Sequence, residues 1–228
     1  MRRILCQEVK NLRDLGGYMT LDCKVTKFNS IFRSDVPVFL TEKELFFFRN
    51  NNLTTIIDLR TKEENLKKIN YFQDKEFAYY NITLKGENCP KREKDIPYGY
   101  MEIIDDINNI KLVFDIIKNS SGSILINCNS GKDRTGVICM LILLLAKVSE
   151  QDIIADYEVS YIYLIDNIRK MHQENPNLPK FLGKSKPEYM EKTLKLFHEK
   201  YQTIENYFRV IGYNKQEIEM ILKKIIEV

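Results

Sequence analysis

The feature that most constrains the fold of this chain is the nine-residue segment 128–136, Cys-Asn-Ser-Gly-Lys-Asp-Arg-Thr-Gly. An apolar run at 123–126 precedes it and predicts a strand, and an apolar run at 137–145 follows it and predicts a buried helix. A strand that turns directly into a helix leaves the first N–H groups of the helix without partners, and the helix dipole favours negative charge there. We therefore expect segment 128–136 to form an anion-binding loop.

Three residues of the segment carry chemistry that suits a phosphate ester. Cys128 begins it, and a thiol at a helix N-terminus beside a cation ionises readily and acts as a nucleophile. Arg134 offers a planar fork to two phosphate oxygens, and Gly131 lacks the Cβ that would obstruct a tight bend. We expect the thiolate to attack phosphorus and form a cysteinyl-phosphate, which water then hydrolyses. A buried cysteine beside an unrelated surface arginine is the alternative, because the spacing alone arises easily by chance.

Other segments of the chain accompany this loop. They are 11–18 (Asn-Leu-Arg-Asp-Leu-Gly-Gly-Tyr), 32–34 (Phe-Arg-Ser), 57–60 with Glu63 and Glu64, Asp156-Tyr157 with Ser160, and positions between 189 and 218. In this order they resemble the motifs of the bacterial tyrosine-phosphatase-like family (tyrosine phosphatase family 3), which includes mycobacterial protein tyrosine phosphatase B and a Listeria lipid phosphatase. The resemblance covers nearly the whole chain. It implies a cysteine-dependent phosphatase without metal or cofactor, acting on phosphotyrosine proteins, phosphoinositides or both.

The resemblance also implies roles for the remaining loop residues. Asn129, Ser130 and Gly131 would bind the phosphate, largely through backbone N–H groups that point at it. Lys132 would add a second positive charge, which suits a substrate with more than one phosphate, although a solvated charge at the start of a helix is equally expected. Thr135 would hydrogen-bond the sulfur as it leaves, or would simply cap the helix.

Asp133 is the residue that the resemblance favours as general acid, the group that protonates the leaving oxygen. A carboxylate in the first turn of a helix also complements the helix dipole. The alternative acid is Asp95, which stands in the charged run 91–95. The resemblance further makes Arg13 an additional phosphate contact, and the alternative for it is a turn held by an ion pair with Asp14.

One position departs from the family pattern. The family carries a histidine directly before the nucleophile, where it supports the thiolate, and this chain carries Asn127. An asparagine forms hydrogen bonds but has no titratable charge, so we expect activity that is weaker or shifted to higher pH. A catalytically weak phosphate-binding module is therefore the second hypothesis. Against it stands the intact catalytic set of Cys128, Asp133 and Arg134.

Helical patterns alternate with short β-branched runs in the first two thirds of the chain. This alternation predicts an α/β fold with a central, mostly parallel sheet flanked by helices, and it agrees with the cysteine-phosphatase fold that the resemblance implies. Strands are expected at 29–33, 53–59, 77–82 and 123–128, and a long helix is expected at 98–118.

Capping signals indicate where other helices begin. Thr41 and Thr61 each open a capping box. Beyond the helix that follows the loop the pattern is wholly helical, with helix starts at Ser149, Pro187 and Asn214. We expect an all-helical C-terminal third within a single domain that spans residues 1–228.

Several segments are expected to surround the loop. Asp58 and Arg60 end a strand, and because the carboxyl ends of parallel strands face the ligand crevice, we expect them to support the loop from behind. A helix at 152–171 is expected beside the mouth of the site. Phe181 and Leu182 would supply apolar walls there, although apolar residues in such patterns more often belong to a core.

Composition limits the range of functions. The chain has 228 residues, of which 44% are hydrophobic and 29% charged, as in ordinary globular proteins. Its net charge of +3 suits anionic substrates and is far from the profile of a nucleic-acid-binding protein. Five cysteines without a Cys-x-x-Cys pair indicate neither a disulfide framework nor a zinc site, and we expect the cysteines other than Cys128, Cys89 among them, to be reduced structural thiols.

The remaining expectations concern alternatives and location. Asp133 follows Gly131-Lys132, so no Walker A pattern exists and nucleotide triphosphatase chemistry is disfavoured. Arsenate reductases carry a similar loop near the N-terminus, whereas here it lies at mid-length. The longest apolar run, 137–146, is too short to span a bilayer, and the N-terminus lacks the apolar core of a signal peptide. We expect a cytoplasmic monomer without integral membrane association, with export left open because some members of the family are secreted.

Overall fold

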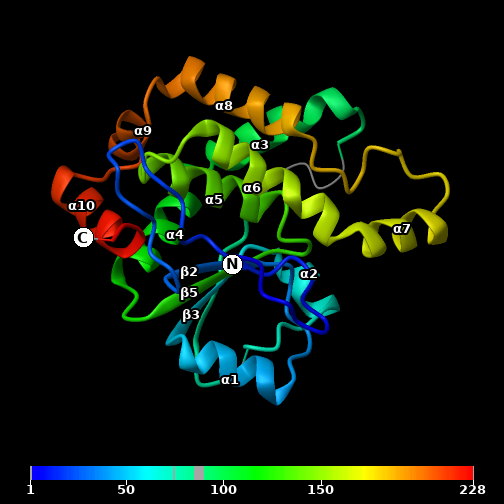
Figure 1. Ribbon diagram of the computed structural model, residues 1–228. Coiled ribbons are helices and arrows are strands. Elements are labelled where there is room, and N and C mark those ends of the chain that lie inside the picture. The colour runs from blue at the N-terminus through cyan, green and yellow to red at the C-terminus, as the bar shows by residue number, and fades with distance from the viewer. Residues whose placement is uncertain (1, 74, 85–89, 228) are drawn as a thin grey trace.

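A computed structural model describes residues 2–73, 75–84 and 90–227 of the protein. Within them lies a five-stranded sheet with helices on both faces (Figure 1). The strands are β1 (Arg13–Asp14), β2 (Ile31–Ser34), β3 (Leu53–Asp58), β4 (Ala78–Asn81) and β5 (Ser123–Asn127). Their order across the sheet is β1-β2-β5-β3-β4. β1 runs antiparallel to β2 and the other neighbouring strands are parallel, which confirms the expected mostly parallel sheet.

β5 lies in the middle of the sheet, and all of its residues are buried. Parallel strands that are covered on both faces are largely apolar, and the middle residues Ile124, Leu125 and Ile126 make this one so. Its side chains alternate between two cores, because successive residues of a strand point to opposite faces. Ile124 and Ile126 join the larger core and Leu125 joins the smaller one. In β3, Ile57 and Ile56 divide between the same two cores.

Ten α-helices and a short 3-10 helix are present in the described ranges. They are α1 (Glu42–Asn50), α2 (Lys62–Lys67), the 3-10 helix Glu93–Asp95, α3 (Ile96–Ile104), α4 (Ile107–Asn119), α5 (Arg134–Leu145), α6 (Glu150–Tyr163), α7 (Ile165–Glu174), α8 (Pro187–Tyr201), α9 (Ile204–Val210) and α10 (Lys215–Ile225). α1 packs on the smaller core, and most of the later helices pack on the larger core on the other side of the sheet (Figure 1). The expected capping boxes at Thr41 and Thr61 are both present.

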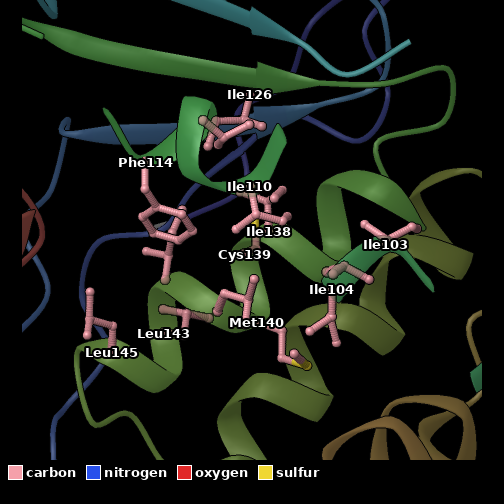
Figure 2. Packing of buried hydrophobic residues seen from close by; sticks show 14 of the residues in the cluster. Ile103, Ile104, Ile110, Phe114, Ile126, Ile138, Cys139, Met140, Leu143 and Leu145 are labelled. Carbon is pink, nitrogen blue, oxygen red and sulfur yellow. The ribbon is translucent and has the colours of Figure 1, made fainter. Parts of the chain in front are cut away.

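α5 is the central helix of the larger core. All of its residues except Leu144 are buried, as expected of a helix whose sequence from Val137 onward is apolar on every face. Figure 2 shows Ile138 and Met140 of α5 within this core, with Ile126 of β5 on one side and Ile104 of α3 on the other. This packing fixes the position of the N-terminus of α5, where the loop that begins at Cys128 ends.

The helix expected over 98–118 is in fact two helices. α3 ends at Ile104 and α4 begins at Ile107. The hydroxyl of Tyr207 donates a hydrogen bond of 2.7 Å to the carbonyl of Ile104, and the carboxylate of Asp105 accepts hydrogen bonds from side chains of α8. These partners, which are distant in sequence, stabilise the break between α3 and α4. Local sequence patterns did not predict them.

Two other local expectations also differ from the structure. The helix expected over 152–171 turns at Leu164, where the buried side chain separates α6 from α7. Arg13 and Asp14, expected in a turn, form the edge strand β1 and pair with Arg33 and Phe32 of β2.

The C-terminal third is helical, as expected, since the described chain after α5 contains five helices and no strand. No helix in the described ranges combines the length and the apolarity that crossing a membrane requires. Cys89, expected to be a structural thiol, lies outside the described residues.

Candidate active site

The candidate site lies at the carboxyl ends of three neighbouring parallel strands. Asn127, the last residue of β5, is in register with Ser34 at the end of β2 and with Asp58 at the end of β3. Open α/β sheets bind ligands at this edge. Residues 128–133, which we call the cysteine loop, leave β5 here and lead into α5.

Three consecutive carbonyl groups of the cysteine loop are anchored to the surrounding protein. The carbonyl of Asn129 accepts a hydrogen bond from the backbone N–H of Val36 (3.3 Å), and that of Ser130 accepts one from Nδ2 of Asn11 (2.9 Å). The carbonyl of Gly131 accepts one from Nη2 of Arg33 (2.7 Å). In the part of the chain that the structure describes, no protein group accepts a hydrogen bond from the N–H groups of residues 129–133. These N–H groups are therefore available to an anionic ligand.

Gly131 is required at its position for two reasons. Its φ of +64° lies in the left-handed region, which favours glycine. A Cβ at this position would also lie 2.2 Å from the carbonyl oxygen of Ser34. The glycine thus lets the loop bend against the end of β2.

The cysteine loop borders a cavity of about 600 Å³, a size typical of ligand-binding sites. Five expected site residues besides Cys128 line it, namely Asn129, Ser130, Lys132, Asp133 and Arg134. Cys128 is almost wholly buried and lines the cavity. Gly131 and Thr135 are part of the loop and of the first turn of α5 but do not line the cavity.

Arg134 is held by Glu64, which follows β3 in sequence. Nη1 and Nη2 of Arg134 donate hydrogen bonds of 2.6 and 2.8 Å to the two carboxylate oxygens of Glu64. Glu64 Oε1 also accepts a hydrogen bond from Nδ2 of Asn129 (2.5 Å). Burial alone would raise the pKa of Glu64, but the hydrogen bonds from Arg134 and from the backbone of Thr61 outweigh it and lower that pKa. Nε of Arg134 has no partner among the described residues and stays available to a ligand.

Asp133 lies at the rim of the cavity and contacts a buried tyrosine of α3. The hydroxyl of Tyr100 donates a hydrogen bond to Oδ1 of Asp133, and the hydroxyl of Tyr157 lies 2.6 Å from that of Tyr100. Because the single O–H of Tyr100 is committed to Asp133, Tyr157 must be the donor to Tyr100. Burial and the charge of Asp133 raise the pKa of Tyr100 well above its ordinary value, so it remains a donor.

Lys132 lines the cavity of Cys128, whereas Asp95 does not. Nζ of Lys132 donates a hydrogen bond of 2.8 Å to the carbonyl of Lys184 and lies 3.3 Å from Oδ1 of Asp133. Asp95, the alternative acid, pairs with Arg92 at 2.8 Å and lines a separate hollow that does not include Cys128. The structure therefore brings Asp133 to the cavity of Cys128, and it does not bring Asp95 there.

Arg13 does not line the cavity, in contrast to the expected phosphate contact. Its guanidinium is buried, with Nε 2.8 Å from Asp156 Oδ1 and Nη1 2.6 Å from Asn11 Oδ1. Nη2 donates to the carbonyl of Asp156 and to Oγ of Ser160. Arg33 pairs with the other carboxylate oxygen of Asp156. Arg13 thus contacts Asn11 and Asp156, groups that lie behind the cysteine loop.

Buried polar groups surround the end of β5. Asp58 and Arg60, expected to support the loop, form a fully buried ion pair (2.7 Å) with each other at the end of β3. Nδ2 of Asn70 donates to Asp58 Oδ2 (2.9 Å) and to Asn127 Oδ1 (3.1 Å). Nδ2 of Asn127 and Oγ1 of Thr135 are buried and have no hydrogen-bond partner in the described protein. Thr135 therefore retains an unused donor beside the cysteine loop.

Sequence reasoning had missed three residues that organise the site. Glu64 appeared only as a family landmark and as part of a capping box, although that box (Thr61 with Glu64) fixes its carboxylate. Arg33 was noted only as part of the motif at 32–34, and no sequence pattern indicated a role for Tyr100. Among the described residues, no three His, Cys, Asp or Glu side chains gather as metal ligands would.

Comparison with known proteins gives one family. The profile of the tyrosine phosphatase family matches residues 4–227. A tyrosine-protein phosphatase of Nostoc commune is 27% identical over 186 residues, which are 72% of this chain and 63% of that protein. A putative tyrosine-protein phosphatase of Cupriavidus necator is 23% identical over 162 residues, 65% of this chain and 59% of that protein. The matched part therefore spans about three fifths of the length of these curated relatives.

Solved structures with some similarity include Siw14 and TpbA. The core catalytic domain of the PP-IP phosphatase Siw14 from S. cerevisiae has a TM-score of 0.38 at 22% identity, covering 68% of this chain and 94% of that one. TpbA of P. aeruginosa has a TM-score of 0.35 at 9% identity, covering 59% of this chain and 71% of that one.

Proposed function

Because this chain belongs to the tyrosine phosphatase family, we propose that it is a cysteine-dependent phosphatase that hydrolyses phosphate monoesters through a cysteinyl-phosphate intermediate. The observation that carries this proposal is the cysteine loop itself. Its N–H groups are free while the carbonyl groups of residues 129–131 are anchored to the surrounding protein, and Cys128 lines the cavity that the loop borders. Phosphotyrosine proteins and phosphoinositides are the two substrate classes that the family resemblance implies.

The first step is attack of the Cys128 thiolate on phosphorus. The S–P bond forms, the ester P–O bond breaks, and the leaving oxygen takes the electron pair. The free N–H groups of residues 129–133 and Nε of Arg134 bind the equatorial oxygens, where negative charge accumulates. Glu64 binds Nη1 and Nη2 of the guanidinium, so Arg134 is already oriented and Nε remains for a phosphate oxygen.

Asp133 is the proposed general acid. It lies at the rim of the cavity, two residues beyond Gly131, and Tyr100 fixes one of its carboxylate oxygens. A proton from Asp133 would neutralise the leaving oxygen, and the resulting carboxylate would then accept a proton from the water that attacks the S–P bond. Asn129, Ser130, Lys132 and Thr135 complete the proposed substrate-binding set around these residues.

A phosphate-binding module with little turnover is the second candidate function. Asn127 favours it, because the residue before Cys128 has no titratable side chain, and its amide nitrogen lacks a hydrogen-bond partner among the described residues. Both functions need the same loop, so the two candidates differ only in the rate at which the protein hydrolyses a phosphate ester.

Hydrolysis of an aryl phosphate tests the proposal. We expect turnover by the natural protein, its loss in Cys128→Ser, and a loss of roughly a hundredfold or more in Asp133→Asn for an ester with a poor leaving group. Full activity in Cys128→Ser would show that Cys128 is not the nucleophile. Phosphate binding without turnover by the natural protein would favour the second candidate.

A further inference from the structure

Two buried side chains hold the cysteine loop from outside the cavity. Nδ2 of Asn11 donates a hydrogen bond to the carbonyl of Ser130 (2.9 Å), and Nη2 of Arg33 donates one to the carbonyl of Gly131 (2.7 Å). Asn11 and Arg33 are fully buried, and neither lines the cavity. A ligand in the cavity would therefore contact the loop but not these two side chains.

The two held carbonyl groups determine the direction of two N–H groups. The peptide groups of the loop are trans, and a planar trans peptide group points its C=O and its N–H to opposite sides. The carbonyl of Ser130 shares a peptide group with the N–H of Gly131, and the carbonyl of Gly131 shares one with the N–H of Lys132. Because both carbonyls bond to groups outside the cavity, the two N–H groups point the opposite way, toward the cavity.

The Arg33 contact carries a full positive charge. Nη1 of Arg33 pairs with a carboxylate oxygen of Asp156, while Nη2 holds the carbonyl of Gly131. The guanidinium lies beside the first turn of α5, since a Cβ at Gly136 would be 3.5 Å from Nη2. Charge-assisted hydrogen bonds are roughly twice as strong as neutral ones, so this contact should strongly polarise the peptide group that contains the N–H of Lys132.

The neutral contact is held in place by the same network. Nη1 of Arg13 donates a hydrogen bond to Oδ1 of Asn11 (2.6 Å), so the amide of Asn11 turns its Nδ2 to Ser130. Nε of Arg13 lies 2.8 Å from Oδ1 of Asp156, and Arg33 pairs with the other carboxylate oxygen. One carboxylate of α6 therefore orients both side chains that hold the loop.

We propose that Asn11 and Arg33 are positioning residues of the phosphate site, and that each aims one N–H group of the cysteine loop at the bound anion. Asn11 aims the N–H of Gly131, and Arg33 aims the N–H of Lys132. This inference rests on the proposed function, since it concerns the same loop. It adds two residues that contribute to phosphate binding without contacting the phosphate.

Amide NMR spectra of the Cys128→Ser protein, titrated with inorganic phosphate, test the two assignments separately. An N–H that donates to a phosphate oxygen moves downfield, so the amides of Gly131 and Lys132 should both move. Adding Asn11→Ala should reduce the shift at Gly131 by roughly half or more and leave that at Lys132. Adding Arg33→Met, which keeps the length of the side chain but has no donor, should do the reverse.

The affinity of the same proteins for phosphate gives a second measure. A neutral hydrogen bond contributes less than a charged one, so calorimetry should show a loss of about threefold for Asn11→Ala and of about tenfold or more for Arg33→Met. Asn50→Ala and Arg49→Met are the matched controls, because both residues are exposed on α1, which packs on the smaller core. We expect the controls to change the affinity by less than about twofold and to leave both amide shifts unchanged.

Urea denaturation shows which variants are folded. Asp156 keeps Arg13 as its partner in Arg33→Met, so we expect this variant to fold, and if it does not, Asn11→Ala decides the proposal on its own. A loop that merely loosens would lose both shifts alike. Equal loss of the two shifts in Asn11→Ala, or no loss of either, would therefore overturn the assignment.

Phosphate binding separates failure of this inference from failure of the proposed function. If the Cys128→Ser protein binds phosphate but the two amide shifts do not respond separately to the two substitutions, the positioning roles are wrong and the proposed function stands. If it binds no phosphate and the natural protein hydrolyses no aryl phosphate, both proposals fall together.

Discussion

At the scale of single residues, Glu64 determines how Arg134 can act. It takes Nη1 and Nη2 of the guanidinium and leaves Nε for a ligand. Replacing Glu64 with Gln removes the charge and one of these acceptors while keeping the size of the side chain. A hydrogen bond to a charged group contributes about 1.5–3 kcal/mol, so we expect Glu64→Gln to lower kcat/KM for an aryl phosphate by roughly tenfold to a hundredfold.

Glu63→Gln is the matched control for this change. Glu63 is the exposed neighbour of Glu64 in α2 and does not line the cavity. Its substitution should leave kcat/KM within about twofold of the natural protein, since exposed substitutions away from a site have small effects. Equal losses in the two variants would show that the pairing with Arg134 has no role.

Tyr100 acts on the same scale through Asp133. Tyr100→Phe removes the hydroxyl that fixes the carboxylate and leaves the packing of the ring against Tyr157. We expect the rate to fall about tenfold for esters with poor leaving groups and very little for nitrophenyl phosphate, because a good leaving group needs no acid. Rates across a series of aryl phosphates measure this, with the exposed Tyr98→Phe of the same helix as control. A loss that is uniform across the series would contradict a role through Asp133.

At the scale of elements, a single carboxylate connects one helix with two strands. Asp156 of α6 pairs with Arg13 of β1 and with Arg33 of β2, and all three side chains are buried. Arg33 in turn holds the carbonyl of Gly131, so the network also fixes the cysteine loop. Burial alone would raise the pKa of Asp156, but the two arginines outweigh it and hold that pKa well below its ordinary range.

Asp156→Ala should therefore be strongly destabilising. It leaves two buried guanidinium groups without their carboxylate, which costs about 3–5 kcal/mol when a buried ion pair is broken. Chemical denaturation measures the free energy of unfolding, and Asp166→Ala on α7 is the control, since its side chain is 90% exposed. A loss below 1 kcal/mol for Asp156→Ala would contradict the network.

Elements were predictable from sequence where their signals are local. The capping boxes at Thr41 and Thr61 and the buried run before Cys128 specify their own structure through neighbouring residues. The break after Ile104 depends on Tyr207, which lies 103 residues away, and local patterns do not contain such a partner.

At the scale of the whole molecule, stability should depend on pH through Asp35. This residue lines the cavity and accepts hydrogen bonds from the backbone of Asn11 and Lys10, but burial raises its pKa to about 6. Between the ordinary value of 3.8 and about 6 the folded state holds the proton more tightly than the unfolded state. The contribution of Asp35 to the free energy of unfolding is therefore highest below pH 4, and it falls as the pH rises from there to about 6.

Comparison with Asp35→Asn isolates this contribution. The natural protein should lose roughly 2–3 kcal/mol relative to the variant between pH 4 and pH 7, because each pKa unit corresponds to 1.36 kcal/mol. Urea denaturation at several pH values measures both proteins. Parallel stability profiles would show that the carboxyl group titrates alike in the folded and unfolded states.

The sequence predicted the architecture of the whole molecule better than it predicted the contacts within the site. Alternating patterns predicted the mostly parallel sheet, and the apolar runs on either side of Cys128 predicted the strand and the helix that flank the loop. Arg13 was expected at the phosphate because its motif lies by the active site in the family, but Asp156, 143 residues later, draws it behind the loop. Glu64 was missed as a partner of Arg134 for the same reason, since 70 residues separate them.

The proposed mechanism requires that Cys128 carries the phosphoryl group during turnover. Rapid acid quenching of the Asp133→Asn protein with an aryl phosphate, followed by mass spectrometry of its peptides, tests this most directly, since slowed hydrolysis lets the intermediate accumulate. We predict one phosphoryl group on the sulfur of Cys128 and none in a Cys128→Ser, Asp133→Asn double variant. Turnover without a phosphorylated Cys128, or with the group on another residue, would contradict the mechanism.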